Sequence, residues 1–234
     1  NTLTRYQILN PNQSKTLLIL HGWGQSSSAW QIVAGLLSKN YSIILLDLPG
    51  FGGTEHLAGS PSVPEYTQFI LDFIKKLGLK KPAILGHSFG GQIAINLAAK
   101  HPKLLSKLIP LSPAGIRNKN RSYKKFKFIK KILPKAITKL ILKQLSSIDY
   151  YNATPKHKQI LKQIVVHDLT KKLSQIKSPA TINWGSEDKE IPYHGKTMAN
   201  LILNSNLVVL YGADHNPHLK SPQNLAQAIN QNLK

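Results

Sequence analysis

The sequence predicts an α/β fold with a mostly parallel central sheet, and three observations support this. Short, continuous apolar runs recur along the 234 residues, as expected of strands buried on both faces. Helical patterns separate these runs, and such alternation is typical of βαβ units with right-handed crossovers. One run is followed at once by a serine between glycines, in the segment AILGHSFGGQIA at 83–94.

The apolar runs predict six buried strands, and one further strand precedes them. The six are TLLILH at 16–21, SIILLDL at 42–48, PAILGH at 82–87, KLIPLS at 107–112, PATINW at 179–184 and LVVLYG at 207–212. TRYQILN, near the N-terminus, is expected to form a single antiparallel strand at the sheet edge. Between the strands, apolar spacing predicts helices at 28–38, 64–77, 89–100, 192–203 and 221–233.

The alternation is interrupted once, between 114 and 177. This block contains no convincing strand, and apolar residues from Ile129 to Leu145 recur at three- and four-residue spacing with lysines between them. Pro134 is expected to kink or split this helical pattern. We therefore expect a core formed by 1–113 and 178–234, with an inserted helical cap at 114–177.

The composition excludes several classes of protein. Cysteine is absent, which rules out disulfides, a thiolate nucleophile and a cysteine-based metal site. No apolar run approaches the roughly 18 residues of a membrane span, and no signal peptide is visible. We expect a soluble, cytoplasmic protein.

The net charge of +21 is concentrated in the predicted cap. Residues 116–177 hold 17 of the 31 Lys and Arg residues and two of the ten acids. On an amphipathic pattern, such lysines usually form a solvated face. The alternative is that the cap recruits an acidic carrier protein or an anionic membrane surface. Nucleic-acid binding is not expected, because no helix-turn-helix, zinc or RNP-type signature accompanies the charge.

The serine at the centre of GHSFG is a candidate nucleophile. Gly86, Ser88 and Gly90 match G-x-S-x-G, in which a sharp strand-to-helix turn exposes the hydroxyl and leaves no room for neighbouring side chains. The alternative is an ordinary Gly-Ser turn. The strand before and the helical pattern after it favour the nucleophile.

A serine nucleophile needs a base and a carboxylate that orients it, and open α/β sheets gather both at the carboxyl ends of strands. TINWGSEDKEIP follows one strand and offers Asp188, whereas LVVLYGADHNPH follows the next and offers His215. Asp188 could instead cap a helix, with Glu187 or Glu190 as the acid. The order Ser88, Asp188, His215 is the one expected for a G-x-S-x-G hydrolase.

Five segments together resemble the α/β-hydrolase superfamily, especially its compact serine esterases and C–C hydrolases with a helical cap. They are HGWG at 21–24, DLPGFGGT at 47–54, GHSFGG at 86–91, WGSEDKEIP at 184–192 and GADHNPHLKSP at 212–222. The resemblance implies a Ser88–Asp188–His215 triad and places HGWG in the oxyanion loop, with the backbone N–H groups of Trp23 and Phe89 holding the oxyanion. HGWG beside a basic cap is also similar to the pimeloyl-carrier-protein methyl ester esterases.

Other residues are candidates for substrate contact. Among the histidines, the family's G-x-x-H pattern favours His215 as the base, so its competitors are assigned to the pocket or its support. Apolar cap residues that face inward would suit a hydrophobic acyl or aryl group. The candidate substrate-binding residues are His21, His87, Phe126, Ile129, Leu133 and His218.

The sequence thus predicts a carboxylesterase that works through an acyl-enzyme and needs no metal or cofactor. Thioesterases, lactonases and C–C bond hydrolases share the same triad and remain alternatives. A protein of another class, which binds a ligand, a membrane surface or an acidic carrier through its cap, is the further alternative.

Overall fold

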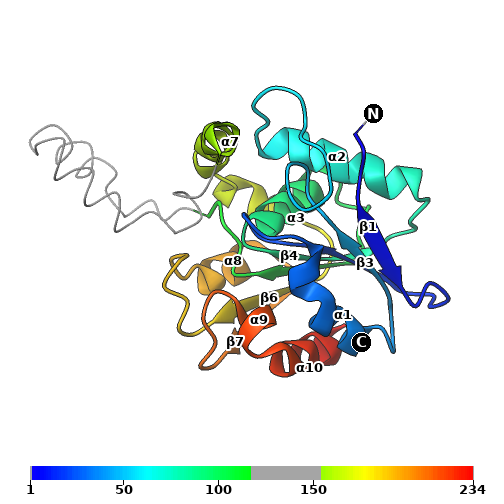
Figure 1. Cartoon of the computed structure of the whole chain (residues 1–234). Coiled ribbons are helices and arrows are strands. Elements are labelled where there is room, and N and C mark those ends of the chain that lie inside the picture. Colours follow the sequence, from blue (N-terminus) through cyan, green and yellow to red (C-terminus); the bar gives the residue numbers. More distant parts are fainter. Residues whose placement is uncertain (1, 117–153, 234) are drawn as a thin grey trace, which may run out of the picture.

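A seven-stranded sheet runs through the centre of the part of the chain that the structure describes, residues 2–116 and 154–233 of a computed structural model (Figure 1). The strand order is β1-β3-β2-β4-β5-β6-β7; β1 pairs antiparallel with β3, and all other neighbours are parallel. The strands are β1 (Tyr6–Leu9), β2 (Thr16–Leu20), β3 (Ser42–Leu46), β4 (Ala83–His87), β5 (Lys107–Leu111), β6 (Ala180–Gly185) and β7 (Ser205–Leu210).

Helices connect these strands and cover both faces of the sheet. They are η1 (Ser27–Trp30), α1 (Gln31–Leu37), α2 (Val63–Lys76), α3 (Phe89–Lys100), α7 (Pro155–Val165), η2 (Thr170–Gln175), α8 (Gly195–Leu201), α9 (Pro217–Lys220) and α10 (Pro222–Asn232). The start of α2 is fixed by a capping box, in which the Glu65 carboxylate accepts from the Ser62 N–H at 2.8 Å. The six predicted buried strands and the antiparallel edge strand are confirmed, with ends that differ by at most two residues in the buried strands.

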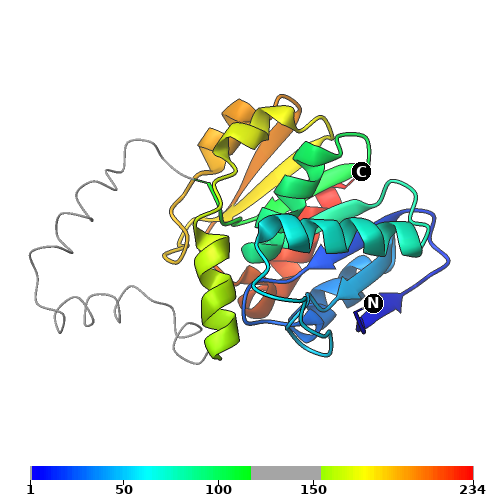
Figure 2. The same ribbon diagram turned by 90° about the horizontal axis from the view of Figure 1, so that it is seen from above.

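The core is divided by the sheet into two layers, because successive side chains of a strand point to opposite faces. In β2, Leu18 and Leu20 pack towards the layer that contains α2, α3, α7 and α8, and Leu17 and Ile19 pack towards the layer of α1 and α10. Figures 1 and 2 show these helices on opposite sides of the sheet. Both faces are covered, which explains the continuous apolar runs of the sequence.

Only part of the predicted cap lies in the described residues. Residues 154–177 contain α7 and η2 and no strand, and they pack on α3: the Gln92 side-chain amide donates to the carbonyls of Ile164 at 3.2 Å and His167 at 3.1 Å. The chain re-enters the sheet at β6, where Leu108 of β5 lies beside Ala180 and Leu111 beside Asn183. The division into core and cap stays a prediction.

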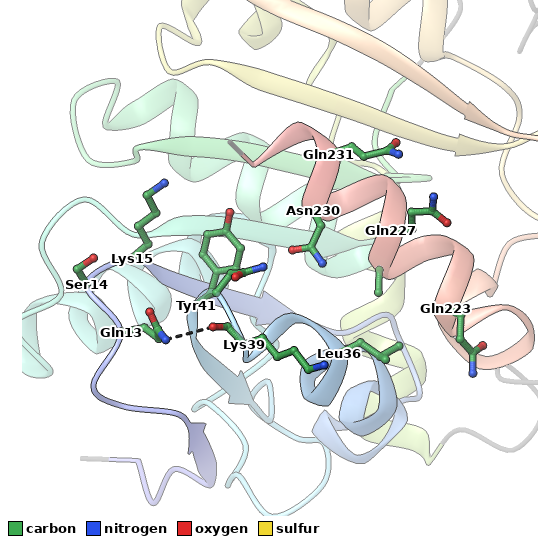
Figure 3. A pocket seen from close by; sticks show the side chains of 12 residues that line it. Gln13, Ser14, Lys15, Leu36, Lys39, Tyr41, Gln223, Gln227, Asn230 and Gln231 are labelled. Atoms are coloured by element: carbon green, nitrogen blue, oxygen red, sulfur yellow. Dashed lines mark hydrogen bonds between the residues drawn. The ribbon is translucent and has the colours of Figure 1, made fainter.

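A cavity of about 720 Å³ opens at the amino ends of the parallel strands (Figure 3). Lys15 and Tyr41, which directly precede β2 and β3, line one side, and Gln227 and Asn230 of α10 line the other. Ser88 follows the carboxyl end of β4, at the opposite edge of the sheet. This cavity is therefore separate from the site predicted by the sequence.

Candidate active site

Ser88 occupies the sharp turn between β4 and α3. Its backbone angles, φ 50° and ψ −110°, lie in a region that L residues rarely adopt, at a cost of about 1–3 kcal/mol. Neighbouring backbone fixes this turn: the Ser88 N–H donates to the Leu111 carbonyl, and the Ser88 carbonyl accepts from Gln92 at 3.0 Å and Ala114 at 3.1 Å. This strained junction has the strand-to-helix geometry of the nucleophile elbow that the motif predicts, and the role of Ser88 as a nucleophile stays a prediction.

The two glycines of the motif are required by close packing. A Cβ on Gly90 would lie 2.3 Å from the Leu20 carbonyl oxygen and 2.6 Å from that of His21. A Cβ on Gly86 would lie 2.5 Å from the carbonyl oxygen of Gly90. All these neighbours are backbone atoms of the sheet and helix, so they cannot move aside. Any larger residue at either position would displace the elbow.

His215 and Asp188 meet beside this elbow, on the loops that follow β7 and β6. The imidazole Nδ1–H of His215 donates to Asp188 Oδ2 at 2.8 Å, and the side chain of Asp188 is fully buried. The other carboxylate oxygen, Oδ1, accepts the N–H groups of Glu190 at 2.9 Å and Ile191 at 3.1 Å. Both oxygens are thus satisfied, which fixes the orientation of the imidazole.

The carboxylate of Asp188 is held in its charged form. Burial raises the pKa of Asp188, but the hydrogen bond and charge of His215 and the N–H of Ile191 outweigh it, so the net shift of the pKa is downward. An ionised acid in this position stabilises an imidazolium on His215.

Within the described residues, no hydrogen bond joins the Ser88 hydroxyl to His215. The ring of His87, which precedes Ser88, nevertheless packs against the ring of His215 with centroids 4.8 Å apart. Hydrogen bonds between a catalytic serine and its base are often loose without substrate. The third link of the triad stays a prediction.

Three histidines that the sequence associates with substrate contact are buried to 1% exposure. His87 Nε2 donates to the backbone carbonyl of His215 at 2.8 Å, and His218 stacks on Trp30 with centroids 4.3 Å apart. His21 Nδ1 donates to the carbonyl of Gly22, while its Nε2 accepts from the N–H of Leu48. These contacts hold the loops around the site, and substrate contact by the three histidines stays a prediction.

Burial keeps these three imidazoles neutral. It lowers the pKa of His21 to about 4, with partial compensation by the Gly22 carbonyl. It also lowers the pKa of His218 to about 3, assisted by the nearby His215. For His87, burial is again the largest cause, and the pKa lies well below its ordinary value.

The side chains of the two residues predicted to supply the oxyanion donors are in contact. The rings of Trp23 and Phe89 meet edge to face at 5.5 Å, and Phe89 is the first residue of α3. In the described part of the chain, neither backbone N–H donates to another protein group. Free N–H groups at a helix start and in an adjacent loop can stabilise a developing negative charge.

Helix α7 packs against the aromatic residues Trp23 and Phe51 through His157. His157 Nε2 donates to the carbonyl of Gly50 at 2.9 Å, and its ring contacts those of Trp23 and Phe51. Three predicted substrate-binding residues, Phe126, Ile129 and Leu133, lie outside the described residues.

A chain of polar side chains that no sequence motif indicates runs beside His215. The Gln25 side chain donates to Asn216 Oδ1 at 2.9 Å, and Asn216 Nδ2 donates to Glu190 Oε1 at 3.3 Å. Glu190 Oε2 in turn lies 3.9 Å from His215 Nε2. The sequence offered Glu190 only as a rival to Asp188. Its position two residues after the acid is the signal that could have placed it near the base.

The described ranges 2–116 and 154–233 contain no group of three or more His, Cys, Asp or Glu residues placed to hold a metal ion. They also contain no helix with the length and apolar character needed to cross a bilayer.

Comparison with known proteins links this geometry to a family. A family model described as the alpha/beta hydrolase fold matches residues 15–145. The uncharacterized hydrolase YugF of Bacillus subtilis (strain 168) is 28% identical over 96% of this chain and 90% of its own length. The monoacylglycerol lipase ABHD6 of Homo sapiens is 26% identical over 94% of this chain and 75% of its own.

A solved structure extends the similarity to three dimensions. The crystal structure of a putative lipase, lip1 from Acinetobacter baumannii AYE, superposes with a TM-score of 0.79 and 26% sequence identity. The match covers 100% of this chain and 90% of that chain. The predicted fold class is thereby confirmed.

Proposed function

Because the chain belongs to the alpha/beta hydrolase family, we propose that it is a serine hydrolase that cleaves carboxylic esters. One observation carries the proposal: the buried pair of His215 and Asp188, joined at 2.8 Å, lies beside the strained elbow of Ser88. A buried carboxylate that orients a histidine next to a serine elbow is the arrangement that activates a serine hydroxyl.

The reaction takes two steps. His215 Nε2 removes the proton of the Ser88 hydroxyl as Oγ attacks the ester carbonyl, and Asp188 stabilises the imidazolium that forms. The N–H groups of Trp23 and Phe89 stabilise the oxyanion, each contributing about 3 kcal/mol to the transition state. His215 then donates the proton to the leaving alcohol. Water hydrolyses the acyl-enzyme by the same route, with His215 again acting as base.

The substrate we propose is an ester with a hydrophobic acyl or aryl group. The aromatic rings of Trp23, Phe51 and Phe89 pack together next to the elbow; Phe51 and Phe89 are buried, so the half-buried ring of Trp23 is the part of this cluster that an apolar group can reach. The names of two relatives, a monoacylglycerol lipase and a putative lipase, are consistent with acyl esters. A thioesterase, a lactonase or a C–C bond hydrolase would use the same residues.

The basic cap remains a candidate for partner binding. Lys156, Lys158 and Lys162 of α7 continue the lysine-rich pattern into the described residues. In this proposal the cap attracts an acidic carrier protein or an anionic membrane surface. Co-sedimentation with vesicles that contain 0% or about 30% anionic lipid tests the membrane version, which predicts binding that falls with salt. Equal binding to both kinds of vesicle would exclude it.

Hydrolysis of p-nitrophenyl acetate, butyrate and octanoate by the wild type and Ser88→Ala tests the central proposal. We expect kcat to fall by about a thousandfold or more in the variant. We also expect labelling by a fluorophosphonate probe in the wild type and none in Ser88→Ala. The order of the three esters would measure the depth of the acyl pocket.

Ser14→Ala is the matched control, because Ser14 lines the cavity at the opposite edge of the sheet. It should retain wild-type activity and labelling. Wild-type protein that neither hydrolyses these esters nor takes up the probe would contradict the proposal. A binding role for the cap would then become the leading function.

A further inference from the structure

A second carboxylate, that of Glu190, lies at the catalytic end of the candidate base. His215 binds Asp188 through Nδ1, which leaves Nε2 as the nitrogen that exchanges protons during ester cleavage. Glu190 Oε2 lies 3.9 Å from this Nε2, and the Glu190 side chain is 51% exposed, whereas that of Asp188 is fully buried. Glu190 therefore reaches the reacting side of the imidazole from the solvent side.

The carboxylate of Glu190 is held in place and forms no ion pair with a Lys or Arg side chain of the described residues. Asn216 Nδ2 donates to Oε1 at 3.3 Å, and the Glu190 backbone N–H donates to Asp188. Lys220, a cation whose charge interacts with Glu190, pairs instead with Asp214 at 2.5 Å. No Lys or Arg side chain of residues 2–116 or 154–233 forms an ion pair with Glu190. Glu190 is thus an acidic side chain beside His215 in a chain of net charge +21, and its charge acts on Lys220 only at a distance, as a minor cause of the raised pKa of that lysine.

The position of Glu190 determines which part of a substrate it meets. In ester cleavage, Nε2 passes its proton to the oxygen of the leaving alcohol, so groups near Nε2 face the alcohol and not the acyl chain. A carboxylate there attracts positive charge on the alcohol and repels negative charge. We propose that Glu190 is a specificity-determining residue that makes the enzyme prefer esters of cationic alcohols, such as amino alcohols. This inference rests on the proposed ester hydrolysis.

Acetylcholine and 3,3-dimethylbutyl acetate test this preference, because they have the same shape and acyl group and differ in the charge of the alcohol. A carboxylate about 5 Å from the cation, at the high effective dielectric of a half-exposed pair, should change kcat/KM by roughly fivefold to fifteenfold. We expect the ratio of kcat/KM for the two esters to fall by that factor in Glu190→Gln. The ratio should also shrink in 1 M NaCl for the wild type, and much less for the variant.

Glu187→Gln is the matched control, since Glu187 is an exposed carboxylate in the same loop with no ion pair to His215. It should leave the ratio within about twofold of the wild type. A structural role for Glu190 would lower kcat for both esters alike and leave their ratio unchanged, and that result would overturn the proposal. Circular dichroism and thermal melting verify that both variants fold.

A binding measurement separates failure of this inference from failure of ester hydrolysis. Choline and 3,3-dimethyl-1-butanol are titrated into the wild type and Glu190→Gln, with the His215 imidazole signal followed by NMR. Tighter binding of choline that disappears in the variant supports selection by Glu190 even if no ester is cleaved. Equal affinity of the wild type for both alcohols overturns the inference even if ester hydrolysis is found.

Discussion

Replacing Asp188 by Asn should abolish the action of His215 as a base and leave the protein folded. Asp188 Oδ1 accepts two backbone N–H groups, from Glu190 and Ile191, while Oδ2 accepts from His215 Nδ1. An asparagine must keep its carbonyl oxygen on the two N–H donors. The opposite orientation would turn the amide NH2 towards two N–H donors, the exposed one of Glu190 and the part-buried one of Ile191, and would break both hydrogen bonds. With its oxygen kept on the N–H groups of Glu190 and Ile191, the asparagine turns its side-chain NH2 towards His215 Nδ1.

This orientation forces the wrong tautomer on the base. Nδ1 of His215 must accept from the amide, so the proton moves to Nε2, where the Ser88 proton would have to go. The same exchange in serine proteases lowers kcat by about 10⁴-fold, and we expect a loss of about that size on p-nitrophenyl butyrate. Asp214→Asn is the control: Asp214 adjoins His215 but contacts Asn216 and Lys220, so kcat should stay within about threefold.

Two measurements can refute this reasoning. Steady-state kcat of a folded Asp188→Asn within tenfold of the wild type would show that the acid does not set the tautomer. Nitrogen-15 NMR that finds the proton still on His215 Nδ1 would show that the amide takes the other orientation.

The remaining predictions concern the elbow and the buried histidines. Gly90→Ala should abolish ester hydrolysis and lower the melting temperature, because its Cβ would clash with the backbone carbonyls of Leu20 and His21. The control is Gly35→Ala, at an exposed position of α1 with nothing within 4 Å of the new Cβ, which should stabilise the fold by about 0.5–1 kcal/mol. Equal loss of activity in both variants would refute the packing argument. With folded pKa values of about 4 and 3 against an ordinary 6.5, His21 and His218 take up protons more readily in the unfolded state. The free energy of unfolding is therefore unaffected by protonation of these two histidines above pH 6.5 and decreases as the pH falls towards 4. At pH 5 the decrease is about 2 kcal/mol for each histidine. Urea unfolding at pH 7.5 and 5.0 measures this loss, and equal stability at both pH values would contradict it.

Much of the fold was predictable from the sequence, because the signals are local. Continuous apolar runs identify strands buried on both faces, and the G-x-S-x-G motif fixes where one strand ends and α3 begins. Since parallel strands share a carboxyl edge, the chain positions of Ser88, Asp188 and His215 predict that they gather there. The pairing of His215 with Asp188 agrees with this argument.

Other features depend on contacts between distant segments and leave no local pattern. His218 and Trp30 are 188 positions apart, and no pattern in the neighbouring sequence predicts that their rings stack with planes 2° from parallel. The burial of His87 against the carbonyl of His215 likewise follows from packing of the β7 loop on β4. The proximity of Glu190 to Nε2 requires the side-chain geometry of a loop, which spacing alone does not supply.

The pairing of β5 with β6 has a consequence for how such an enzyme can vary. Ser88 and both oxyanion candidates belong to the segment before β5, whereas Asp188 and His215 belong to the segment after β6. The two halves are aligned where Leu108 meets Ala180 and Leu111 meets Asn183, not by the length of chain between them. A slip of one residue there would shift the base by about 3.3 Å and turn every side chain of β6 to the other face. Loop-closure entropy grows slowly with length, so a longer or shorter connection between these strands costs little entropy where the packing of α7 and η2 on α3 is kept. A change of register within the strand pair, by contrast, would displace the site.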